Sequence, residues 1–125
     1  MRVNGDPIHD GADHFYGWMQ VDHATGNIYV VFYDRRTDKN NVLARVILAR
    51  STDGGSNFAN YAWTTRSFDP SWQFIGDYNA LAVYAGRAYG AWTTAKSVSA
   101  KKLRTMTLRQ MFASRTYVQL GEARF

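Results

Sequence analysis

Residues 51–58, with the sequence STDGGSNF, constrain the fold more than any other stretch of the chain. They directly follow an apolar run at 46–49. The side chains of Ser51 and Asp53 can accept hydrogen bonds from backbone N–H groups, and the two glycines can adopt positive φ without a steric penalty. Phe58 can then fold back and bury its ring. The stretch therefore predicts a tight hairpin turn between two strands.

The remaining pattern predicts an all-β chain. Apolar and β-branched runs separated by glycine turns and polar loops are typical of strands, and no segment has a helical period. The expected strands are residues 15–21, 28–33, 43–50 and 62–68.

The sequence then repeats itself at a shift of 60 residues. Residues 18–36 align with residues 78–96 without a gap. The matched pairs are Gly26 with Gly86, Tyr29 with Tyr89, Phe32 with Trp92, Val46 with Met106, and Leu48 with Leu108. Repeated units of strand, turn and strand indicate a propeller. The second copy has no equivalent of the 51–58 turn, because Met111 and Ala113 stand opposite Ser51 and Asp53.

The pattern Ser51, Asp53, Gly55 and Phe58 resembles the Asp-box (BNR repeat) of sialidase (neuraminidase)-like β-propellers, with Phe58 where the family usually has Trp. The resemblance implies antiparallel four-stranded blades of a sialidase-like β-propeller. Residues of about 14–68 would form a first blade with the Asp-box, and about 74–125 a second, degenerate blade. Because propellers carry 4–8 blades, this ring is incomplete.

The same resemblance implies a relative of exo-α-sialidases and other glycoside hydrolases that acts on sialylated or other glycans outside the cytoplasm, in an extracellular or periplasmic setting. A non-catalytic glycan- or protein-binding propeller module is the alternative. We expect the chain alone to be inactive, and to need missing blades or self-association, because the outward faces of the two blades would carry side chains such as Val30, Phe32, Ala91 and Trp92 without a partner. Residues 1–7 lack the apolar core of a signal peptide, and the chain looks like part of a longer protein.

Alternating turns of a meander sort the loops onto two ends of the sheet. The 51–58 turn is expected at one end, with residues 23–27. The opposite end, which carries the substrate in the resembled family, gathers the following polar and aromatic residues: His9, Asp10, Asp13, His14, Asp34, Arg35, Arg36, Asp38, Trp72, Gln73, Asp77 and Tyr78.

Four of these are candidate catalytic residues by the resemblance. Arg35 or Arg36 could clamp a sugar carboxylate, since arginine binds carboxylates in a bidentate manner; the alternative is an ion pair with a neighbouring aspartate. Tyr78 could be the nucleophile and Asp77 the acid, or the two could serve as a rim aromatic and a loop cap. The family's arginine triad and Tyr–Glu pair cannot be assigned to this chain, so its status as an enzyme stays open.

The sequence gives little support for a bound metal ion or cofactor. The three histidines have no tight metal-ligand spacing. Asp6, Asp10 and Asp13 could bind Ca²⁺, but they lack the EF-hand spacing and could equally be solvated loop acids. We expect no cofactor and no metal. The chain has no cysteine, which excludes disulfides, and no apolar run long enough to span a membrane.

Charge is concentrated near the end of the chain. Residues 96–125 hold seven of the Lys and Arg residues against one acid, Glu122, within a chain of net charge +5. Such a stretch can bind an anionic partner or form a solvated strand face. No nucleic-acid-binding motif is present, so we expect no nucleic-acid partner.

Overall fold

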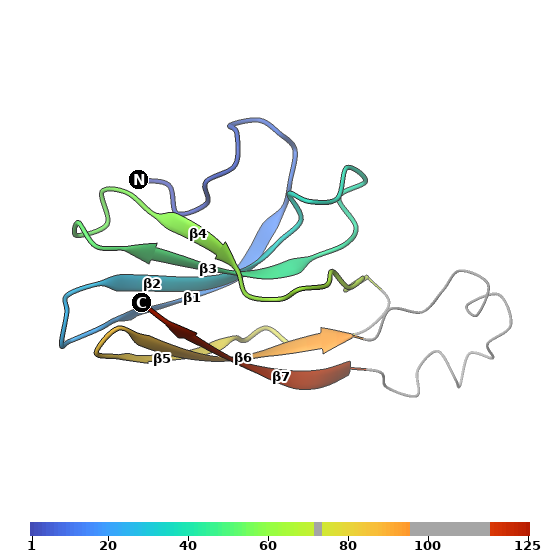
Figure 1. Cartoon of the computed structure of the whole chain (residues 1–125). Helices are drawn as coiled ribbons and strands as arrows, with labels where there is room; N and C mark the ends of the chain where they lie inside the picture. Colours follow the sequence, from blue (N-terminus) through green and yellow to red (C-terminus); the bar gives the residue numbers. More distant parts are fainter. Residues whose placement is uncertain (72–73, 96–115) are drawn as a thin grey trace, which may run out of the picture.

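The computed structural model describes residues 1–71, 74–95 and 116–125, and every regular element in them is a β-strand. The first sheet contains β1 (His14–Val21), β2 (Ile28–Asp34), β3 (Arg45–Ser51) and β4 (Ala59–Ala62), in chain order. The second sheet contains β5 (Ala80–Tyr84), β6 (Arg87–Ala95) and β7 (Thr116–Arg124). All neighbouring strands are antiparallel, and the two sheets form two layers (Figure 1). The all-β prediction is confirmed.

The predicted position of the fourth strand is wrong. Residues 62–68 were expected to form it, but β4 covers Ala59–Ala62 and pairs with β3 from Ile47 to Arg50. Because the 51–58 turn is tight, the chain begins to pair with β3 again directly after Phe58. Residues 63–68 form no strand, although the Trp63 N–H still donates to the Val46 carbonyl at 2.8 Å and Phe68 forms an isolated bridge with Ala44.

The repeat fails at the third strand of the second unit. Tyr29 pairs with Arg50, whereas Tyr89 pairs with Glu122, twelve positions beyond the place that a shift of 60 predicts. The residues that the repeat assigned to this strand, Met106 and Leu108, lie outside the described residues. The connection between β6 and β7 is therefore longer than its counterpart between β2 and β3.

The main core lies between the two layers. Because successive side chains of a strand point to opposite faces, Tyr29, Val31 and Tyr33 of β2 all face the second sheet and are fully buried. Leu81 and Trp92 of the second sheet pack into the same cluster. Trp92 was expected on an outward, unpartnered face, and that prediction is wrong, since its side chain is 2% exposed and contacts Trp63 with ring centroids 5.1 Å apart.

Hydrogen bonds join the layers as well. The hydroxyl of Tyr33 donates to the carbonyl of Thr93 over 2.6 Å, and burial raises the pKa of Tyr33 to about 12. The Asn79 side-chain amide donates to the carbonyl of Tyr16 over 2.6 Å. Buried polar groups of this kind fix the relative position of the layers, because misplacing them leaves unsatisfied donors or acceptors.

Asp22 is the strongest of these links. Its buried carboxylate accepts the N–H groups of Ala24 in its own turn and of Ala85 and Gly86 in the β5–β6 turn, at 3.0, 3.0 and 2.8 Å. The two residues of the β5–β6 turn have φ of 49° and 76°, which suits glycine and strains alanine. The Gly86 N–H, followed by the other donors, lowers the pKa of Asp22 to about 2 despite its burial.

The outer face of the first sheet is covered rather than bare. Phe32, Ile47 and Ala49 form a second buried cluster, against which Val3 and Phe58 pack. The N-terminal segment arches over this sheet in Figure 1. Phe32, which was expected to lie on an unpartnered face, is therefore only 5% exposed.

The 51–58 turn is held by its own side chains. Ser51 Oγ accepts the Gly55 N–H at 2.8 Å and donates to Asp53 Oδ1 at 2.7 Å. Asp53 Oδ1 also accepts the Asn57 N–H at 3.0 Å, and this bond is the main reason that the pKa of Asp53 falls to about 2. Phe58 is half-buried.

Hairpin turns and polar loops separate onto two ends of the molecule. The turns that contain Asp22, Asp53 and Gly86 lie together at one end (left in Figure 1), and the loops after β2 and β4 lie at the other. Asp53 is therefore on the opposite end from Arg36, as expected. Among the described residues, no helix is long and apolar enough to cross a membrane.

We expect Asp22→Asn to lower the thermal unfolding midpoint near neutral pH, because the amide cannot replace the carboxylate as acceptor of three N–H groups. The folded-state pKa of Asp22 is depressed from 3.8 to about 2. Its contribution is therefore present above about pH 4 and is lost as the pH falls towards about 2, so the variant and the wild type should converge in acid. Circular dichroism melts across this range measure the effect. Asp77→Asn, at an exposed position, is the control, and equal midpoints for Asp22→Asn and wild type at neutral pH would contradict the role of Asp22.

A side chain at Gly121 should disrupt the packing between the layers. A Cβ atom there would overlap the indole of Trp92 and lie 3.0 Å from Trp63 Nε1. We expect Gly121→Ala to lower the free energy of unfolding by about 1–3 kcal/mol in urea titrations. Gly17→Ala is the matched control, because no atom lies within 4 Å of its Cβ position. A Gly121 variant as stable as the Gly17 variant would show that the two tryptophans do not pack there.

Candidate functional site

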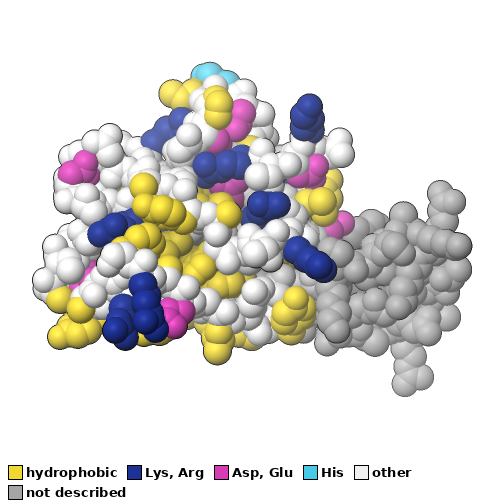
Figure 2. All heavy atoms as spheres, in the orientation of Figure 1, with side chains coloured by type: hydrophobic (Ala, Val, Ile, Leu, Met, Phe, Trp, Pro, Cys, Tyr) yellow, Lys and Arg dark blue, Asp and Glu magenta, His cyan; other side chains and the backbone are white. Residues whose placement is uncertain are grey.

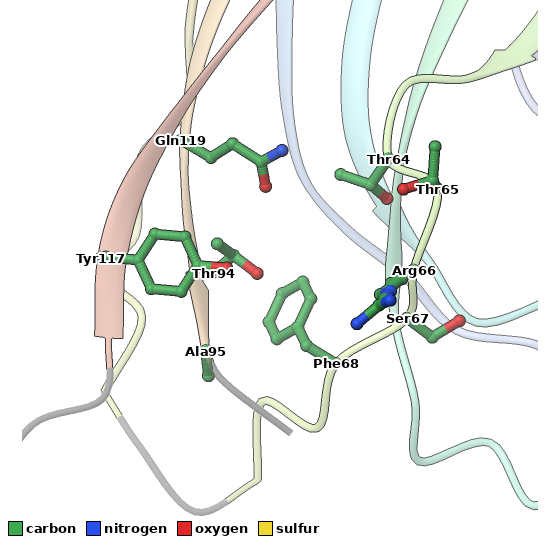
Figure 3. Close-up of a pocket in the computed structure, with 9 residues that line it drawn as sticks. All are labelled: Thr64, Thr65, Arg66, Ser67, Phe68, Thr94, Ala95, Tyr117 and Gln119. Carbon is green, nitrogen blue, oxygen red and sulfur yellow. The ribbon is translucent and has the colours of Figure 1, made fainter. Parts of the chain in front are cut away.

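A cavity of about 420 Å³ opens between the two sheets at the loop end. It is lined by Thr64, Thr65, Arg66, Ser67 and Phe68 after β4, by Thr94 and Ala95 at the end of β6, and by Tyr117 and Gln119 of β7. Figure 3 shows the β7 side chains on one side and those of the segment after β4 on the other. The cavity is therefore formed by the packing of the two sheets, and neither sheet contains it alone.

The lining combines hydrogen-bonding groups with aromatic rings. Thr64 and Thr94 are each only 5% exposed, and Thr64 Oγ1 accepts the Val46 N–H at 3.1 Å, which leaves its own hydroxyl proton for another acceptor. Arg66 is exposed and has no carboxylate partner within the part of the chain that the structure describes. Phe68 is buried and Tyr117 half-exposed. Hydroxyl, amide, guanidinium and ring groups together suit a small, polyhydroxylated or anionic ligand.

The two arginines predicted from the sequence lie outside this cavity, and both are already paired. Arg35 Nη1 contacts Asp13 Oδ2 at 3.1 Å, and its guanidinium lies over the ring of Phe15, 5.2 Å from the centroid. Arg36 Nε donates to Asp34 Oδ2 at 2.6 Å. These contacts match the alternative of ion pairs with aspartates, although Asp34 is buried rather than exposed.

The other two candidates are exposed. Asp77 lies at the surface, and Tyr78 is 75% exposed. Among the described residues, no hydrogen bond or ion pair joins either of them to Arg35 or Arg36. Glu122 pairs instead with Arg124 on β7 at 2.7 Å, so no glutamate lies beside Tyr78. Trp72 and Gln73 lie outside the described residues, as do six of the seven basic residues at 96–125.

A buried charged cluster at the start of β1 and the end of β2 was not anticipated. His14 Nε2 lies 3.3 Å from Asp6 Oδ2 and 3.3 Å from Asp34 Oδ2. Arg36 Nη2 lies 3.6 Å from Asp6 and donates to Asn60 Oδ1 at 2.9 Å. Burial raises the pKa of Asp6, but its own backbone N–H, His14 and Arg36 lower it more, and the net shift is downward. The cluster anchors the N-terminal segment to the first sheet.

The three acids of the N-terminal loop do not converge on a common point. Asp6 belongs to the cluster with His14, Asp10 accepts the Ala12 N–H at 2.9 Å, and Asp13 pairs with Arg35. No group of three or more His, Asp or Glu side chains within residues 1–71, 74–95 and 116–125 is arranged to hold a metal ion. Solvated loop acids were one of the two alternatives from the sequence, but Asp6 is buried beside His14, and the sequence carried no signal for that contact.

Comparison with known proteins gives no further guidance: no family model, no curated protein and no solved structure matches the chain.

Removal of the Arg36 guanidinium should lower the free energy of unfolding far more than removal of the Arg35 guanidinium. Asp34 and Asp6 have side chains that are 1% and 3% exposed, so Arg36→Ala leaves two buried carboxylates with less compensation. We expect a loss of about 3–5 kcal/mol in unfolding free energy. Arg35→Ala is the matched control, and because Asp13 is 58% exposed we expect a loss of about 1 kcal/mol. Equal losses for the two variants in urea titrations would contradict the buried cluster.

Proposed function

We propose that the chain forms two neighbouring blades of a sialidase-like β-propeller and binds a glycan in the cavity between them, without hydrolysing it alone. The observation that carries the proposal is the lining of the cavity between the sheets. Buried threonine hydroxyls, the Gln119 amide and the Arg66 guanidinium surround it, together with the rings of Phe68 and Tyr117. Sugars present hydroxyls that need hydrogen-bond partners and C–H faces that pack on aromatic rings, and acidic sugars add a carboxylate that arginine recognises.

The blade assignment has its own support. The Ser51–Asp53 turn joins β3 to β4 through side-chain hydrogen bonds, at the turn where the resembled family has its Asp-box. Two antiparallel sheets lie face to face, with β1 against β5. A ring would need further blades or further copies of the chain, and a glycan-binding protein of this type would work in an extracellular or periplasmic setting.

An exo-sialidase is the second candidate function. Hydrolysis in that family requires a tyrosine nucleophile beside a glutamate. Tyr78 has no such neighbour among the described residues, and Arg35 and Arg36 already pair with Asp13 and Asp34. These placements favour binding over hydrolysis by this chain.

Saturation-transfer NMR with a sialylated trisaccharide, and with its neutral disaccharide counterpart, tests the proposal. We expect binding of the sialylated sugar by the wild type. Arg66→Ala should weaken this binding by about tenfold or more, because a charge-assisted hydrogen bond is lost. Arg124→Ala is the matched control: it removes the same charge from an exposed position on the outer face of the second sheet, where its partner is Glu122.

A wild-type chain that binds neither sugar, or an Arg66 variant that binds as well as the control, would contradict a glycan site in this cavity. Release of a fluorophore from a sialoside by the wild type would instead establish the second candidate.

A further inference from the structure

Within residues 1–71, 74–95 and 116–125, the two sheets have four edge strands, β1, β4, β5 and β7, and the first three are poor templates for further pairing. The register of β1 shifts between Phe15 and Trp18, with Tyr16 at a positive φ of 52°. Strand β4 has four residues and β5 has five. Bulges and short lengths are the usual devices by which proteins prevent edge strands from pairing with other chains.

Strand β7 has none of these devices. It runs for nine residues, and all nine pair with β6 in an unbroken register from Arg87–Arg124 to Ala95–Thr116. It contains no proline, no lysine and no bulge. Within the described residues β7 pairs only with β6, whereas β3, in the corresponding place of the first sheet, is also paired with β4. In Figure 1, β7 lies at the near edge of the lower sheet.

The side chains of β7 also leave apolar surface uncovered. Val118 and Leu120 point away from the core and are 67% and 77% exposed. Figure 2 shows hydrophobic side chains at the lower margin of the described atoms, over the second sheet. A strand added to this edge would cover part of both residues and would satisfy the outward backbone groups of β7.

The sequence of β7 is complementary to itself in one antiparallel register. If Gln119 lies opposite Gln119 of a second copy, Val118 lies opposite Leu120 in both directions, and the two amides can hydrogen-bond to each other. A register centred on Leu120 would set Val118 opposite Glu122, and one centred on Gly121 would set Val118 opposite Arg124. A register centred on Leu120 pairs Leu120 with itself, and one centred on Val118 pairs Val118 with itself, but each leaves the other apolar residue opposite a polar one. Of the registers centred on these residues, the one centred on Gln119 gives both Val118 and Leu120 an apolar partner.

We infer that the free edge of β7 binds the β7 strand of a second copy, antiparallel and centred on Gln119, so that two three-stranded sheets become one continuous six-stranded sheet. The pairing is symmetric, as most homodimer interfaces are. The pairing uses the backbone edge, the outward side chains of Val118 and Leu120, and the Gln119 amide, which also lines the cavity.

Single cysteines test this register, because the chain has no cysteine of its own. Directly opposed residues of an antiparallel pair have Cβ atoms about 4.5–5.5 Å apart and diagonal neighbours about 7–8 Å, whereas a disulfide requires about 3.5–4.5 Å. Under mild oxidation Gln119→Cys should therefore form a covalent dimer readily. Leu120→Cys, one residue further on, is the matched control and should cross-link much more slowly, as should Tyr84→Cys on the outer face of β5.

Sedimentation provides the second measurement. We expect the wild type to sediment as a dimer, and Val118→Lys to sediment as a monomer with an unchanged circular dichroism spectrum. A monomeric wild type that gives no cross-link through Gln119→Cys would overturn the inference. Faster cross-linking through Leu120→Cys or Tyr84→Cys would overturn it too, since either outcome requires a different interface.

Discussion

The burial of two sheet faces against each other is the constraint on which the rest of this structure depends. Leu81 and Trp92 of the second sheet are buried because they pack into one cluster with side chains of β2 and β3 of the first sheet. The Asp22 carboxylate then fixes the distance between the two hairpin ends, and the Tyr33 hydroxyl fixes β2 against β6. Hydrophobic contact thus provides the attraction, and the buried hydrogen bonds select one arrangement of the layers.

Much of the fold follows from local sequence chemistry, and the remainder follows from contacts that no local pattern encodes. The strands around Tyr29 and Val46 are predictable because β-branched and aromatic runs end at glycine and polar turns. The 51–58 turn is predictable because Ser51 and Asp53 bond to N–H groups only a few residues away. The position of β4 and the register of β7 depend on where the chain meets another strand, which a pattern of residue types fixes only loosely.

For the candidate site, too, part could be predicted from local sequence and part depends on contacts between distant segments. Its end of the molecule could be predicted, because turns of a meander alternate between two ends. Its residues could not be, since Thr64, Arg66 and Gln119 come from segments that meet only after the sheets have packed. Arg35 and Arg36 drew attention as adjacent loop cations, and an ion pair with a neighbouring aspartate was the alternative interpretation. The structure gives such a pair between Arg36 and Asp34, whereas the partner of Arg35 is Asp13, 22 residues away in the sequence. An arginine without a carboxylate partner is the better indicator of a ligand site, and it can be recognised only from coordinates.

The central claim is that the two sheets form one cooperative unit with a cavity between them. Native-state hydrogen exchange tests this claim most directly. Amides in β2 and β6 should open with free energies that agree within about 1 kcal/mol, because neither sheet can unfold without exposing the shared core. The same agreement should hold on both sides of the cavity, at Val46 and at Gln119. If the opening free energies of the β6 amides are several kcal/mol lower than those of the β2 amides, the second sheet opens independently. That result would contradict both the shared core and the site that it creates.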